Sequence, residues 1–160
     1  MLVCLSKFFI GILIGVMLYY FSGINLGHMY LNNDLNFIDI LLNNLLYFSI
    51  STFGFLTLGL ANVFLLLLNG ALIGFIFAHC FKTNQLLHAC IYLVPHGILE
   101  ICVLILTSTF SYYIILVGYN RFIKKDSAKS HIIKFFTFTI GVSIFLLIIA
   151  ATIETYFKPL

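Results

Sequence analysis

Long apolar runs constrain this chain more than any other feature of its sequence. About 20 residues, rising 1.5 Å each as a helix, span a hydrocarbon core of roughly 30 Å. Runs of this length predict transmembrane helices at residues 3–22, 38–58, 61–81, 95–118 and 132–153. With 62% hydrophobic and 8% charged residues, the chain has too few charges to cover a soluble surface. The sequence therefore predicts an all-α integral membrane protein, with residues 1–160 as a single multi-pass domain in the cell membrane.

The apolar stretch at residues 38–81 is too long for one span, because as a helix it would rise about twice the thickness of the hydrocarbon core. Gly59 and Asn62 interrupt it, so we expect a tight turn there and a span on either side. Residues 86–94 are also apolar, but as a helix they would rise only about 14 Å. That is less than half of the core, which predicts a short re-entrant or interfacial half-helix before Pro95.

The positive charges of the chain are concentrated in one loop. It joins the fourth and fifth expected spans and holds Arg121, Lys124, Lys125 and Lys129, with Lys134 just beyond. Positively charged loops stay in the cytoplasm, so counting spans back from this loop puts the amino terminus inside and the carboxyl terminus outside. Lys7 in the first span agrees with this orientation. So does the loop at 23–37, which is rich in Asn, contains His28 and has no Lys or Arg.

The motif Pro95-His96-Gly97-Ile98-Leu99-Glu100 concentrates polar groups in a predicted span. A carboxylate at the centre of a membrane helix costs about 2.5–3.5 kcal/mol on insertion scales, so such a residue is kept for a partner or a function. His96 and Glu100 are four residues apart and share one helix face, and Pro95 suits the first helical turn. We therefore predict Glu100 and His96 as catalytic candidates, Glu100 as a general base, with the bare backbone of Gly97 beside them.

Three asparagines are predicted near the level of this motif. Asn43 and Asn44 lie early in the second span and Asn69 lies near the middle of the third. Together with His96 and Glu100 they can share one cavity in the outer half of the membrane, where Asn69 in particular could orient Glu100. The alternative is structural, with amides that join helices by hydrogen bonds worth about 0.6–2 kcal/mol each and a His96/Glu100 pair that closes its helix onto a neighbour.

The spacing of His96 and Glu100 also fits two ligands of a metal ion on one helix face. A zinc site needs three protein ligands, and His79 or His88 would have to supply the third, which nothing in their spacing indicates. We therefore expect no metal, with His79, His96 and Glu100 as the weak candidates, and no other cofactor. The 160 residues contain no Gly-rich phosphate-binding loop, so an energy-coupled step would require a separate ATPase.

Taken in order, the polar and small residues of the chain resemble a known family. They are Asn43-Asn44, Gly54, Gly59, Asn69-Gly70 with Gly74, and Pro95-His96-Gly97-x-x-Glu100. This combination, over about residues 36–118, is similar to the stage II sporulation protein M family of small polytopic membrane proteins. The resemblance implies one of two settings. One is a peptidoglycan-remodelling complex during engulfment in spore formers, and the other is peptide maturation or export in circular bacteriocin biosynthesis.

Two function classes follow from these residues and this resemblance. In the first, the protein acts on a small hydrophobic peptide such as a circular bacteriocin, through leader removal, ring closure or export. Glu100 and His96 would then be the catalytic residues of an intramembrane peptidase or cyclase. The residues expected to bind or orient the peptide are Asn43, Asn44, Asn69 and Gly97. In the second class, the protein is a non-catalytic scaffold for a peptidoglycan-remodelling complex in sporulation.

Both classes involve partners within the lipid bilayer. Other membrane proteins are expected, including a separate transport ATPase for the peptide, and a second copy of the chain would give a homo-oligomer. Nucleic acid is not an expected partner, because the net charge is only +3 and no basic run carries interleaved aromatic residues. Whether the first class includes catalysis stays open on the sequence.

The predicted orientation can be tested by labelling intact cells with a membrane-impermeant thiol reagent. In a background without the native cysteines, Asn33→Cys should react from outside and Ser127→Cys should react only after the membrane is permeabilised. The same two variants in opened cells serve as the control for reactivity. Labelling of Ser127→Cys but not of Asn33→Cys in intact cells would reverse the orientation.

Overall fold

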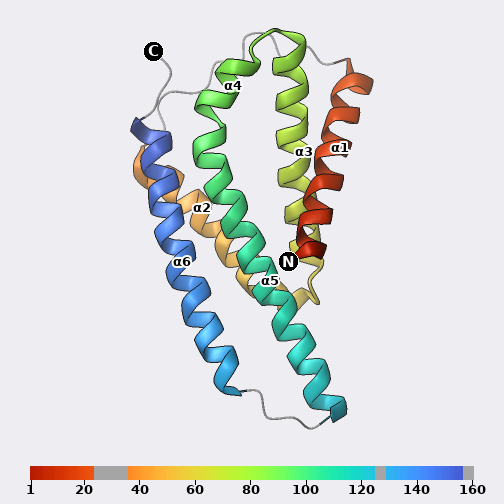
Figure 1. The fold of residues 1–160 in the computed structure, drawn as a ribbon, viewed down its shortest axis with the longest axis vertical. Helices are drawn as coiled ribbons and strands as arrows, with labels where there is room; N and C mark the ends of the chain where they lie inside the picture. The colour runs from red at the N-terminus through yellow and green to blue at the C-terminus, as the bar shows by residue number, and fades with distance from the viewer. Residues whose placement is uncertain (24–35, 125–128, 157–160) are drawn as a thin grey trace.

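The computed structural model describes residues 1–23, 36–124 and 129–156, and every secondary-structure element within them is helical (Figure 1). The elements are α1 (Leu2–Ser22), α2 (Phe37–Thr52), a 3-10 helix η1 (Phe53–Thr57), α3 (Leu60–Lys82), α4 (Leu86–Tyr92), α5 (Val94–Lys124) and α6 (Lys129–Tyr156). The expected outer loop with His28, and much of the cationic loop, lie outside the described residues.

Five helical segments of the described chain are long and apolar enough to cross a membrane. They are Leu2–Ser22, Phe37–Thr57, Leu60–Lys82, Val94–Arg121 and Ile132–Tyr156. Each coincides with one expected span, so the prediction of an all-helical chain with five apolar spans is confirmed. The orientation of the two termini relative to the membrane stays a prediction.

The turn between the second and third spans is a tight left-handed one. Leu58 and Gly59 both have positive φ values, 53° and 85°, and the Gly59 N–H donates to the Gly54 carbonyl oxygen at 2.9 Å. Glycine suits this position because its backbone adopts a left-handed conformation without steric cost. The Tyr112 hydroxyl of α5 donates to the Gly59 carbonyl oxygen at 3.3 Å, so the turn is also attached to the body of the protein.

The segment before Pro95 forms a short helix, α4, that is almost continuous with α5. Only Leu93 separates the two, and hydrogen bonds from Leu93 N–H to Ala89 O (2.9 Å) and from Gly97 N–H to Leu93 O (3.0 Å) run across the junction. Pro95 lies in the first turn of α5, as expected, where its missing N–H is tolerated. A re-entrant or interfacial position for this helix stays a prediction.

The tightest helix pair joins α1 to α3, which are not neighbours in sequence (Figure 1). Glycines meet at this contact, namely Gly11 and Gly15 of α1 with Gly70 and Gly74 of α3. A Cβ atom at Gly15 would collide with the carbonyl oxygen of Ala71, and one at Gly70 with that of Phe8. Small residues at four-residue spacing let two helix backbones approach closely in a membrane. This contact therefore depends on the absence of side chains.

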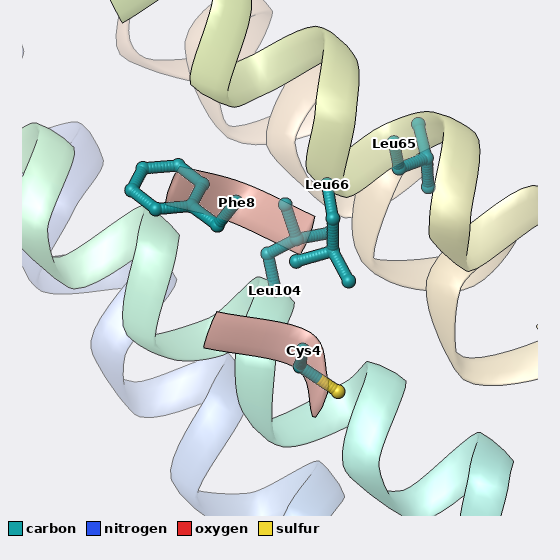
Figure 2. Close-up of a cluster of buried hydrophobic side chains, with 5 residues drawn as sticks. All are labelled: Cys4, Phe8, Leu65, Leu66 and Leu104. Atoms are coloured by element: carbon teal, nitrogen blue, oxygen red, sulfur yellow. The ribbon is translucent and has the colours of Figure 1, made fainter. Parts of the chain in front are cut away.

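A buried apolar cluster connects the α1/α3 pair to α5. It consists of Cys4 and Phe8 from α1, Leu65 and Leu66 from α3, and Leu104 from α5 (Figure 2). The Cys4 Sγ and Thr109 Oγ1 atoms lie 3.7 Å apart, which adds a weak polar contact between α1 and α5. The cluster is the hydrophobic core of the part of the bundle around α3.

Hydroxyl groups hold α2 against α5 on the other side of the bundle. The Thr107 hydroxyl donates to Ser51 Oγ at 2.8 Å, and the Ser51 and Ser108 oxygens are 3.1 Å apart. All three residues are fully buried. Interhelical hydrogen bonds of this kind stabilise membrane helix pairs by about 1 kcal/mol. The structure thus has two packing units, the α1/α3 pair and the α2/α5/α6 group.

The glycine contact predicts a large difference between two identical substitutions. Gly15→Ala should lower the free energy of unfolding by about 1–3 kcal/mol, because the new methyl group forces α1 away from α3. Gly141→Ala on α6 is the matched control: its Cβ would meet no described atom within 4 Å, so it should be neutral or stabilise the helix by up to about 1 kcal/mol. Thermal unfolding in detergent micelles measures both. Equal effects of the two substitutions would show that the close α1/α3 contact does not contribute to the free energy of unfolding.

Candidate functional site

A cavity of about 460 Å³ lies where α1 and α3 face α2 and α5. The candidate residues from the sequence that line it are Asn43, Asn44, Asn69, His96, Gly97 and Glu100. Asn43 is exposed and the other five are half-buried. The structure therefore brings together all six residues that we expected to bind, orient or react. Their roles in function stay predictions.

The walls of the cavity are largely apolar. Side chains from five helices and from the α4–α5 junction contribute, among them Phe8, Phe48, Ile73, Phe77, Ile101, Leu104 and Leu147. Phe8 and Leu104 also belong to the buried cluster of Figure 2, so this cluster closes the cavity on one side. The site thus combines a small polar group of side chains with a large apolar surface, as is usual for cavities that bind small molecules.

One hydrogen bond joins α2 to α5, within the α2/α5/α6 group, at the polar part of the cavity and orients its carboxylate. Asn44 Nδ2 of α2 donates to Glu100 Oε1 of α5 at 2.5 Å. We expected Asn69 to orient Glu100, and the structure gives this position to Asn44 instead. Asn69 Nδ2 donates to the Leu65 carbonyl oxygen of its own helix at 2.9 Å. One N–H of the Asn69 amide is therefore engaged within α3, while its side-chain oxygen has no hydrogen bond from the described residues.

His96 lies one helical turn before Glu100, but no hydrogen bond joins the two in the described structure. Its Nδ1 atom is buried and has no partner among the described residues. A buried, unpaired ring nitrogen is unfavourable and is satisfied by a ligand or by water in a cavity of this polarity. Gly97 borders open space, since a Cβ atom there would meet no described atom within 4 Å. Its backbone is accessible and is not occupied by a neighbouring helix.

Glu154 is a second carboxylate near Glu100, outside the lining of the cavity, that the sequence did not predict there. It lies in the last turn of α6, is half-buried, and is close enough to Glu100 to act on it electrostatically. The expected last span ends at residue 153, which puts Glu154 outside the membrane. The predicted topology contained a usable signal, because the end of that span and the start of the 95–118 span were expected on the same side of the membrane.

The structure does not bring the metal candidates together. His79 is buried, with its Nδ1 atom 3.4 Å from the Tyr19 hydroxyl, and it does not line the cavity. The side chain of His88 lies outside the described residues. In the described part of the chain, no three His, Cys, Asp or Glu side chains form a group that could hold a metal ion. Among the described side chains, His96 and Glu100 therefore have no third ligand of the kind that a zinc site requires.

Comparison with known proteins extends the resemblance noted in the sequence to nearly the whole chain. The pattern of the family "Stage II sporulation protein M" matches residues 4–159. The chain belongs to the stage II sporulation protein M family. An uncharacterized protein of Methanocaldococcus jannaschii is 32% identical over 133 residues, which cover 80% of this chain and 74% of the relative. No solved structure matches the chain.

Family membership and the five apolar helices together indicate a multi-pass membrane protein. The stage II sporulation protein M match covers every element that lines the cavity, including α1 and α6, which lie outside the range we compared in the sequence. All of the residues that line the cavity therefore lie within the part of the chain that matches the family.

The Asn44–Glu100 bond predicts unequal effects for two neighbouring asparagines. Asn44→Ala should lower the free energy of unfolding by about 1–2 kcal/mol, because it leaves the carboxylate oxygen without its donor. Asn43→Ala, at the exposed neighbouring position, should change it by a few tenths of a kcal/mol or less.

A double-mutant cycle with Glu100→Leu, measured by thermal unfolding in detergent, isolates the contact. Additive effects of Asn44→Ala and Glu100→Leu would show that this bond does not stabilise the fold.

Proposed function

We propose that this member of the stage II sporulation protein M family binds a small hydrophobic peptide, such as a circular bacteriocin, and takes part in its maturation or export. The observation that carries the proposal is the cavity itself, with a carboxylate held by Asn44 inside largely apolar walls. A structural carboxylate needs a partner but no adjoining cavity. The space beside Glu100 supports a role toward a bound molecule.

The apolar walls favour an apolar segment in this proposal. Because lipid solvates apolar side chains as well as a protein wall does, a peptide segment in the 460 Å³ cavity is held by close packing and by polar contacts. The backbone N–H and C=O groups of that segment need hydrogen-bond partners in a site that excludes water. The amides of Asn43 and Asn69 line the cavity and can supply such partners, and the absence of a side chain at Gly97 leaves room for the peptide beside them.

Glu100 is the group that would act chemically on the peptide. Its carboxylate accepts a proton from an amine or from water, and the bond from Asn44 limits its rotation. His96, one turn away, carries a ring nitrogen that is unpaired in the described structure and so is available as a second acid or base. A maturation step would use both groups. An export step would use Glu100 for recognition only and would take its energy from a separate ATPase.

Replacement of the carboxylate by its neutral isostere separates activity from folding. Glu100→Gln keeps the Oε1 atom that accepts from Asn44 and removes the charge, so the unfolding temperature should be equal or higher. The amount of mature peptide released by cells that contain the peptide precursor should fall at least about tenfold, since the proton acceptor is lost. Mass spectrometry of the medium and thermal unfolding of the purified variant measure the two quantities.

Two further variants complete this test. Asp39→Asn makes the same change in an exposed carboxylate of α2 outside the cavity and should leave the output unchanged. His96→Ala should reduce the output in the same way as Glu100→Gln. If Glu100→Gln retains full output, the chemical role of this carboxylate is wrong. A non-catalytic scaffold, which in this family would serve a peptidoglycan-remodelling complex, then becomes the better account.

A further inference from the structure

The described lining of the cavity holds one carboxylate and no Lys or Arg. The carboxylate is Glu100, and His96 lies one turn before it on the same helix. An anionic group of a ligand would therefore meet a carboxylate and no compensating cation. A cationic group would find a partner in a site of low polarity, where a charge without a partner is strongly disfavoured.

Several hydrogen-bond acceptors of the cavity are free in the described structure, and the Asn43 amide lines the cavity as both donor and acceptor. One N–H of Asn44 donates to Glu100 Oε1 and one of Asn69 to the Leu65 carbonyl oxygen, while the two amide oxygens have no hydrogen bond from the described residues. Glu100 Oε2 receives no hydrogen bond from the described residues. His96 Nδ1 has no described partner either. An ammonium group, with three N–H donors and no acceptor, matches this set.

We infer that the cavity recognises the free amino terminus of its hydrophobic peptide. The inference rests on the proposed function, which makes the ligand a hydrophobic peptide. It adds that the amino group of this peptide is what the site recognises. The amino terminus lies against Glu100, and the apolar side chains that follow it lie along the walls. A carboxyl terminus or a phosphate does not fit, because either would place a second negative charge beside Glu100.

This recognition also gives the site a place in a reaction sequence. A peptide that still carries its leader has no free amine at this position, so a hydrolytic cleavage must come first and supply the ligand. Once the amine has formed an amide bond in ring closure it can no longer carry the positive charge. The site therefore takes the linear, leader-free peptide, after a peptidase step and before an amide-forming step.

A lipid with an ethanolamine head group carries the same ammonium chemistry. Its phosphate lies a few bonds from the amine and would enter the same cavity, where the described lining offers it no cation. An apolar peptide carries no such second charge near its amino terminus. The peptide is therefore the favoured source of the amine.

The chain contains no tryptophan, so a tryptophan in the ligand reports binding without background. The probes are an apolar hexapeptide with one tryptophan and an amidated carboxyl end, made once with a free and once with an acetylated amino terminus. Titration of purified protein in phosphatidylcholine nanodiscs gives the two dissociation constants. The free amine should bind at least about tenfold more tightly, as expected for a charge-assisted hydrogen bond in a dry site. Glu100→Gln should abolish this preference and Asp39→Asn should retain it.

Three other results would overturn the inference. Equal binding of the two probes overturns the amine inference and leaves a peptide site in place. Binding of neither probe overturns the inference and the proposed peptide function together. Nanodiscs with added phosphatidylethanolamine test the lipid source of the amine. If this lipid prevents binding of the free-amine peptide and added phosphatidylglycerol does not, the cavity binds the lipid amine, and the peptide assignment is overturned.

Discussion

The close approach of α1 to α3 is the constraint on which the rest of the structure depends. Glycines on both helices let the two backbones touch, and this contact sets the position of Phe8 relative to α3. Phe8 then reaches both the buried cluster and the cavity wall. Since lipid solvates apolar side chains as well as another helix does, shape and close packing hold this pair together more than hydrophobicity does. The cavity wall is therefore only as rigid as this contact.

The bond between Asn44 and Glu100 depends on that wall in turn. It joins α2 to α5 at the edge of a cavity whose other side is formed by α1 and α3. A carboxylate with a single amide donor and an open space beside it is incompletely satisfied, and so is His96 with its unpaired ring nitrogen. Groups in this condition are ordinarily completed by a ligand, which connects the packing of the bundle to the proposed peptide site.

The sequence predicted the number of spans, the turn at Gly59 and the gathering of His96, Glu100 and the three asparagines at one cavity, because each follows from length or from membrane depth. It did not predict which asparagine bonds Glu100. Adjacent residues on a helix differ by about 100° in direction, so the choice between partners depends on the rotation of each helix, which packing decides. The sequence also did not predict that α1 packs against α3 instead of α2. The four-residue spacing of Gly70 and Gly74 indicated only the α3 side of that contact. Glu154 was missed through an error of span length.

The pairing of α1 with α3 has a consequence for biogenesis. A ribosome delivers helices to the membrane in chain order, so α1 enters first and its glycine-lined face finds no partner when α2 follows. That face stays uncovered until residues up to about Gly74 have emerged. The insertion machinery or the surrounding lipid must hold α1 during this interval, and the cavity is formed only when the last two helices join a pair that has already assembled.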